Sequence, residues 1–193
     1  AVALTLAGQL RIQAHANRLA NHRLHRAMAA MSDAEFQAPR VSFFGSLAAT
    51  LNHILAVDLY YIGALHGEPG LPQQYAAFVP ATTLAELAPR QRASDERLIA
   101  WCDALDDAGC DAIVDMDRGR EVQRDRAAHV LAHLFMHQTH HRGQLHGMLS
   151  TMGLAPPQLD EFLMPSDASL RSADMAELGW REASVFGDGK PLG

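Results

Sequence analysis

The segment from residue 42 to residue 65, SFFGSLAATLNHILAVDLYYIGAL, constrains the fold most, because it is apolar on nearly every side. After Ser42, its strongly polar side chains are limited to Ser46, Thr50, Asn52, His53 and Asp58. A helix on a protein surface has one apolar stripe, whereas a helix that is apolar all round is buried among other elements. We therefore expect a helix in the middle of a bundle.

A first helix is expected from Leu4 to Met31, where apolar residues recur at helical spacing and Ala, Arg and Leu predominate. The stretch SDAEFQAPR then ends it. In that stretch Ser32 or Asp33 can cap a short turn, and Pro39 stops any continuation of the helix.

Another helix is expected to begin at Thr82 or Thr83 and to reach about Leu105. Glu86 follows Thr83 by three residues, which is the spacing of a capping box. Pro89 is tolerated near the start of such a helix or marks a kink in it.

The last long helix is the histidine-rich one, for which Asp125 is a candidate N-cap. It is expected to run to Met152 and to end at Gly153, a residue type favoured just beyond a helix. The preceding stretch DDAGCDAIVDMDRGREVQRD fits either a short hairpin or an extended loop, and we favour the loop. One short helix is expected within SDASLRSADMAEL.

Four long helical segments joined by long connections predict an all-α protein, a four-helix bundle with a short C-terminal helical tail. The chain of 193 residues suits one domain over residues 1–193, with a core at about 4–165 and an extension at 166–193.

Composition excludes several classes of partner. A formal net charge of −6 argues against a nucleic-acid-binding surface. No apolar run approaches the roughly 20 residues that span a bilayer, and no basic stretch precedes the apolar start of the chain. Cys102 and Cys110 lack a pairing or metal-binding pattern and are expected to be reduced thiols. We expect a cytoplasmic protein with neither nucleic-acid nor membrane partners.

Six of the 11 histidines lie between residues 129 and 149: His129, His133, His137, His140, His141 and His146. Residues three or four apart share a helix face, so the pairs 133/137, 137/140 and 137/141 are equally able to bind one metal ion. A site needs a third ligand, and His53 on the most apolar segment is the candidate. The alternatives are solvated histidines and a core histidine bonded to a carbonyl or carboxylate. Four others, His15, His22, His25 and His66, are expected at the surface or the bundle rim.

Beyond spacing, the chain resembles the DinB-like superfamily of bacterial stress-associated metalloproteins over nearly all of residues 1–165. The matching landmarks are ANRLAN, FFGSLAATLNHILAVDLYY and HQTHHRGQLHGMLSTMGLAPPQLDEFL, of which the block H-x-x-x-H-R-G-Q is the most specific. The resemblance implies that His53, His137 and His141 bind the metal. Relatives often have a Trp after the AN of the first landmark or after the Asp of the second, and this chain lacks it at both places.

The resemblance implies one divalent ion per chain, with zinc expected and nickel, iron or manganese also suited to three imidazoles. Asp58 and Gln144 are candidates to orient a ligand ring, and His133 is a candidate to line the mouth of the site. Arg142 is expected to pair with a carboxylate, for which Asp160 is one candidate. Two glycines of the same segment, Gly143 and Gly147, are expected to let a neighbouring helix approach closely.

Two functions remain open at this point. The relatives include S-transferases and an isomerase that use a low-molecular-weight thiol, so one hypothesis is a metal-dependent thiol transferase or isomerase acting on a small electrophile. The other is a non-catalytic stress-response protein in which the ion is structural or sensory, since no paired carboxylates or cysteine flank the histidines in sequence. Because related proteins pair, we also expect a homodimer.

Overall fold

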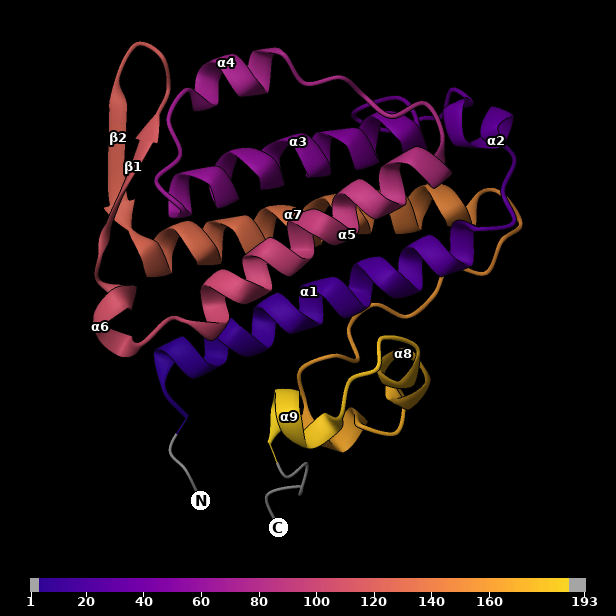
Figure 1. The fold of residues 1–193 in the computed structure, drawn as a ribbon. Coiled ribbons are helices and arrows are strands. Elements are labelled where there is room, and N and C mark those ends of the chain that lie inside the picture. Colours follow the sequence, from indigo (N-terminus) through magenta and orange to yellow (C-terminus); the bar gives the residue numbers. More distant parts are fainter. Residues whose placement is uncertain (1–3, 188–193) are drawn as a thin grey trace.

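Four long helices form the bundle in the computed structural model, which describes residues 4–187 (Figure 1). They are α1 (Leu6–Met28), α3 (Leu47–Leu65), α5 (Leu84–Asp103) and α7 (Ala127–Ser150). Helices α5 and α7 each contact both α1 and α3, so that α1 and α3 lie diagonally across the bundle. The expected all-α fold with long connections is confirmed.

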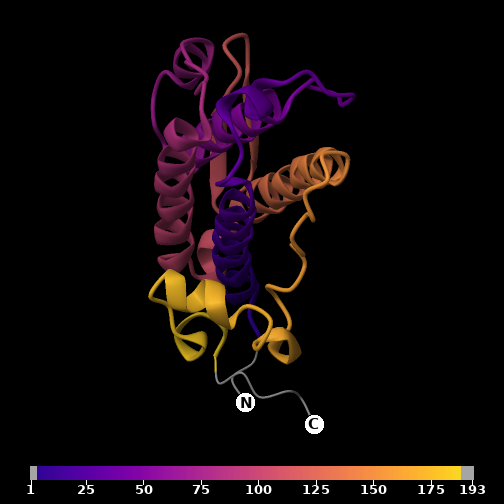
Figure 2. The same ribbon diagram turned by 90° about the vertical axis from the view of Figure 1, so that its right-hand side faces the viewer.

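Short elements decorate the two ends and one side of this bundle. They are α2 (Asp33–Gln37), α4 (Leu71–Ala76), α6 (Asp107–Cys110), β1 (Ile113–Asp117), β2 (Val122–Arg126), a 3₁₀ turn (Pro165–Asp167), α8 (Ser172–Glu177) and α9 (Glu182–Phe186). Figure 1 shows α4 above α3 and the hairpin β1–β2 at the end of the bundle where α7 begins. In the view of Figure 2, the loop between α2 and α3 projects from the bundle, and α8 and α9 gather near the foot of α1.

Side-chain caps begin three of the four long helices. Thr5, Ser46 and Thr83 each accept a hydrogen bond from the backbone N–H three residues later. Each cap satisfies one of the otherwise unpaired N–H groups of its first turn. The expected box at α5 is altered, because the carboxylate of Glu86 bonds to Thr82 and not to the N-cap Thr83.

Helix α3 is buried along most of its length, as its composition predicts. Contrary to the expectation from sequence, it is long and apolar enough to span a membrane, but 78% of its most apolar window is buried inside the bundle. Its first half packs into a core with Leu24, Leu87 and Leu145, and its second half into another with Leu98 and Leu131. The apolar faces of α3 are therefore covered by the other helices.

The prediction of an extended loop between α5 and α7 is wrong, because this segment forms the antiparallel hairpin β1–β2. Val114 and Met116 alternate inward, and the turn is closed by Gly119, whose positive φ of 82° suits a residue without a side chain. The prediction that Asp125 caps α7 is also wrong. Asp125 lies in β2, paired with Val114, and the N-cap residue is Arg126, which makes no side-chain cap.

Two expectations about residue placement are wrong as well. A Cβ added at Gly143 or Gly147 would meet nothing within 4 Å, so these glycines do not mediate a close helix approach. His15 is not at the rim but is 5% exposed, where its ring packs edge-on against Trp180 at 5.1 Å. Its Nδ1 lies 2.9 Å from the carbonyl oxygen of Arg11, which satisfies the buried ring.

The C-terminal segment packs on α1 through buried ion pairs. The Arg23 guanidinium donates to Asp174 at 2.7 Å and to Glu161 at 2.7 Å, and it also donates to the carbonyl oxygens of Gln158 and Leu170. Asp174 is 1% exposed, and its charge depends on Arg23 and on Arg26, whose Nη2 lies 3.2 Å from its other oxygen.

Replacing Arg23 by Ala should therefore lower the free energy of unfolding by about 3–5 kcal/mol, because it leaves the Asp174 carboxylate buried without its main cation. Urea unfolding of both proteins measures the difference. Arg124→Ala is the matched control, since Arg124 pairs with Asp115 on the exposed hairpin and its loss should cost about 0–1 kcal/mol. Equal losses in the two variants would contradict the account of the C-terminal segment.

Candidate metal centre

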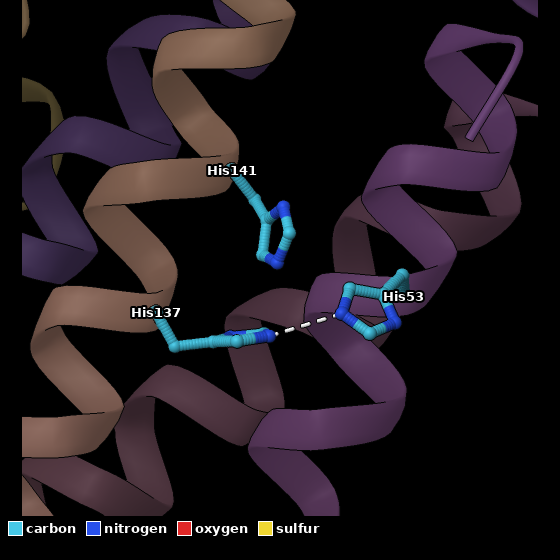
Figure 3. A group of neighbouring side chains, drawn as sticks. All are labelled: His53, His137 and His141. Carbon is cyan, nitrogen blue, oxygen red and sulfur yellow. Dashed lines mark hydrogen bonds between the residues drawn. The ribbon is translucent and has the colours of Figure 1, made fainter. Parts of the chain in front are cut away.

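Three histidine rings from two helices converge on one point (Figure 3). His53 lies on α3, and His137 and His141 lie one turn apart on α7. The Nε2 atoms of His53 and His137 are 3.0 Å apart, and one potential ligand atom from each of the three residues lies within 4.8 Å of the others. The structure thus brings together the three residues that the resemblance implied as ligands.

The donor set and its spacing fit a divalent metal ion. Two imidazole nitrogens bound to one ion at about 2.0–2.1 Å, with an angle of about 90–110° between them, lie about 2.8–3.4 Å apart. The 3.0 Å separation between His53 and His137 falls within this range. Among residues 4–187, no acidic side chain or cysteine joins the group, so the three-histidine group could hold an ion with nitrogen ligands alone.

Burial favours the neutral form of two of the rings, His53 and His137, and the neutral form is the one that binds a metal. Partial burial lowers the pKa of His137 to about 3, with further lowering from the nearby His141 and His53. Burial also lowers the pKa of His53 from its ordinary value, again helped by His141. A metal ion therefore competes with few protons for these nitrogens at neutral pH.

Neighbouring groups orient two of the three rings. The Nδ1 of His141 is 2.8 Å from the Oε1 of Gln144, which leaves Nε2 of that ring free for an ion. Phe44, from the loop before α3, stacks at 4.3 Å on His53 and lies 5.3 Å from His141. The Nδ1 of His137 is buried and has no hydrogen-bond partner in the described part of the chain.

Asp58 does not touch a ligand ring but lies in a buried network behind the site. It accepts hydrogen bonds from Gln138 at 3.0 Å and from Gln91 at 2.8 Å, and Gln91 also donates to Asp95. Burial raises the pKa of Asp58 to about 7 and that of Asp95 to about 6. Asp58 thus acts on the site only through Gln138, the residue next to His137.

The expected pairing of Arg142 with Asp160 is wrong. Arg142 is buried, and its Nη1 donates to the Oδ1 atoms of Asn17 at 2.5 Å and Asn21 at 3.1 Å on α1. Asn17 and Asn21 in turn donate to Asp95, so the charge of Arg142 is balanced across amides by a carboxylate of α5. Sequence spacing gives no signal for partners that are more than a hundred residues away.

Two hollows flank the histidine group. One of about 420 Å³ is lined by Tyr60, Tyr61, Tyr75, Arg118, His133 and His137, together with Val57, Pro72 and Asp117. The other, of about 500 Å³, reaches His53 and is lined by Phe44, Asn52, Tyr75 and Phe78 with mostly small or apolar neighbours. His133 lines the first hollow together with His137. His129 and His140 are exposed, and the His140 ring lies 4.8 Å from that of His141. Sequence reasoning missed Phe44, Arg118 and the tyrosines.

Comparison with known proteins agrees with the resemblance seen in the sequence. The model of a family described as the DinB family matches residues 12–175, which covers all four long helices apart from the first turns of α1. A search of curated proteins finds no match to the chain.

Purified protein should bind about one divalent ion per chain, and His137→Ala should abolish this binding because two imidazoles hold an ion poorly. Gln144→Leu should weaken affinity about 10–100-fold, since it removes the group that orients His141. His140→Ala is the control, because it tests the i, i+3 alternative on the same helix and should bind normally. Elemental analysis and titration calorimetry supply the measurements, and full binding by His137→Ala would show that the ligand set is different.

Asp58→Asn should change how stability depends on pH. The folded pKa of about 7 lies above the ordinary value of 3.8, so the folded protein keeps a proton that the unfolded chain has released. As the pH rises from roughly 5 to 6.5, the free energy of unfolding of the wild type should fall by up to about 1.4 kcal/mol per pH unit because of this group. The variant should not show this fall. Urea unfolding across this range tests it: parallel curves for the two proteins would mean that Asp58 is charged throughout.

Proposed function

This chain belongs to the DinB family, and on that premise we propose that it uses one divalent ion, held by His53, His137 and His141, to activate a low-molecular-weight thiol for attack on a small electrophile. One observation carries the proposal: three imidazoles converge between two hollows large enough for small molecules. When bound, the ion would supply a positive charge that lowers the pKa of a thiol. Zinc suits three imidazoles best, and nickel, iron or manganese also fit.

The nucleophilic sulfur has to come from outside the chain. Cys102 and Cys110 are both buried, and burial raises the pKa of the Cys102 thiol to about 12 and that of Cys110 above its ordinary value. A thiol in such surroundings is rarely ionised and does not act as a nucleophile. A free thiol entering beside the histidines meets no such barrier.

The surrounding residues have defined tasks in this proposal. Gln144 accepts the Nδ1–H of His141 and so holds that ring with Nε2 toward the site. Phe44 covers His53 and His141 and limits the access of water. His133 lines the same hollow as His137, where its imidazole can accept the proton that the thiol releases. The sulfur then bonds to the electrophilic carbon. In a substitution the bond from that carbon to its leaving group breaks and the leaving group takes the electron pair; in an addition the electron pair moves to the neighbouring atom, which takes the proton.

Metal-loaded protein should therefore consume a thiol and an alkylating electrophile at least tenfold faster than His137→Ala, with His140→Ala as the matched control. Loss of free thiol measured over time gives the rate, and an equal amount of free metal ion corrects for the uncatalysed reaction. Equal rates for wild type and His137→Ala across a panel of thiols would refute the enzymatic proposal.

If the enzymatic proposal is refuted, the second hypothesis, a structural ion, is favoured, because the histidines link α3 to α7. Removing a structural ion by chelation lowers the melting temperature by many degrees, since metal-binding energy then adds to folding energy. Homodimer formation and a cytoplasmic location stay predictions.

A further inference from the structure

The hairpin β1–β2 brings one arginine, Arg118, to the hollow beside His137. The turn that carries it is fixed at two points. The Tyr60 hydroxyl donates to the carbonyl oxygen of Asp117 at 2.6 Å, and the N–H of Gly119 donates to the Asp117 carboxylate at 2.7 Å. The Arg118 side chain therefore extends from a short turn that is held in place by hydrogen bonds.

The guanidinium of Arg118 is held in place by tyrosines. Its central carbon lies 4.9 Å from the ring centre of Tyr60 and 5.4 Å from that of Tyr61, distances at which a cation is attracted to an aromatic face. Nη2 donates to the Tyr61 hydroxyl at 3.1 Å and to Gln123 at 3.2 Å, and Nε donates to Gln123 at 3.3 Å. These bonds use Nε and Nη2, so Nη1 is left for another acceptor.

No carboxylate of residues 4–187 forms an ion pair with Arg118, although the chain as a whole has a formal net charge of −6. Arg124 on the same hairpin differs, since its Nε lies 3.0 Å from the Asp115 carboxylate. The Asp117 carboxylate, which also lines the hollow, already accepts the Gly119 N–H. A preorganised arginine without an acidic partner is a binding group for an incoming carboxylate.

The two hollows beside the histidines differ in the charged groups that line them. The one of about 420 Å³ holds Arg118 and also Asp117, whose carboxylate accepts the Gly119 N–H, and its walls include the rings of Tyr60, Tyr61 and Tyr75. The one of about 500 Å³ on the His53 side has no lysine, arginine, aspartate or glutamate in its lining. A reactant's carboxylate is therefore favoured at Nη1 of Arg118 in the first hollow, with the flat carbon body of that reactant against the tyrosines and its reactive end toward His137.

We propose that Arg118, with Tyr60 and Tyr61, forms a carboxylate-binding subsite for one of the two reactants at the histidine site. The role of the subsite in a reaction rests on the proposed thiol chemistry. The binding of a carboxylate by the subsite does not depend on that chemistry. The carboxylate can belong to the electrophile or to the thiol, because both kinds of molecule commonly carry one. Arg118 is in either case a positioning residue that holds a reactant.

The test pairs reactants that differ only in charge. The electrophiles are 4-(bromomethyl)benzoate and its methyl ester, and the thiols are 3-mercaptopropionate and 2-mercaptoethanol. In each reaction a sulfur–carbon bond forms, the carbon–bromine bond breaks, bromide leaves with the electron pair, and the thiol proton goes to the buffer. Arg118→Gln is compared with Arg124→Gln, which removes the same charge from the same hairpin outside the hollow.

For one of the two pairs, the ratio of KM for the charged reactant to KM for the neutral one should rise at least tenfold in Arg118→Gln, with a smaller rise in Arg118→Lys. The ratios should stay at the wild-type value in Arg124→Gln. The pair that responds identifies which reactant carries the carboxylate. Equal ratios in Arg118→Gln and Arg124→Gln for both pairs would overturn the subsite.

A binding measurement separates this inference from the proposed reaction. Calorimetric titration with 4-methylbenzoate and with 3-mercaptopropionate requires no turnover. If no thiol reaction occurs but either ligand binds at least tenfold more weakly to Arg118→Gln than to Arg124→Gln, the proposed function fails and the subsite stands. If wild type binds neither ligand, the subsite is overturned even where the thiol reaction occurs.

Discussion

One buried hydrogen-bond network joins all four long helices and fixes the rotation of α7, on which the histidine site depends. Its members are Asn17 and Asn21 of α1, Asp58 of α3, Gln91 and Asp95 of α5, and Gln138 and Arg142 of α7. Polar groups buried this deeply cost free energy unless they are paired, so α7 must present Gln138 and Arg142 inward. The residues one position earlier, His137 and His141, are then turned by about 100° toward α3.

This geometry explains why a polar centre and a metal-binding group lie back to back in one bundle. The network holds two carboxylates whose pKa values are raised by burial, to about 7 for Asp58 and about 6 for Asp95. On the other side, burial lowers the pKa values of His53 and His137. Gln138 separates the two, donating to Asp58 while its neighbour His137 faces His53. The carboxylates thus stay out of the site, and only imidazole nitrogens are left to face it.

The long helices could be predicted from the sequence, because their periodicity and caps are local features. The choice of His53, His137 and His141 came from the resemblance, since spacing alone also allowed His133 and His140. The hairpin was one of two alternatives, and the loop was preferred because β2 is mostly exposed and lacks an alternating apolar pattern, so that its pairing with β1 depends on tertiary contacts. The position of Arg118 over two tyrosines depends on this pairing and could not be predicted. The partners of Arg142 were missed for the same reason, because they lie on α1.

The central claim is that the three histidines hold an ion that also accepts a thiol. X-ray absorption spectroscopy of the zinc-loaded protein tests it most directly, because it counts the atoms bound to the ion and identifies them as nitrogen or sulfur. The account predicts three imidazole nitrogens at about 2.0–2.1 Å and, after a low-molecular-weight thiol is added, one sulfur at about 2.3 Å. A spectrum with fewer than three imidazoles, or one that thiol leaves unchanged, would contradict it.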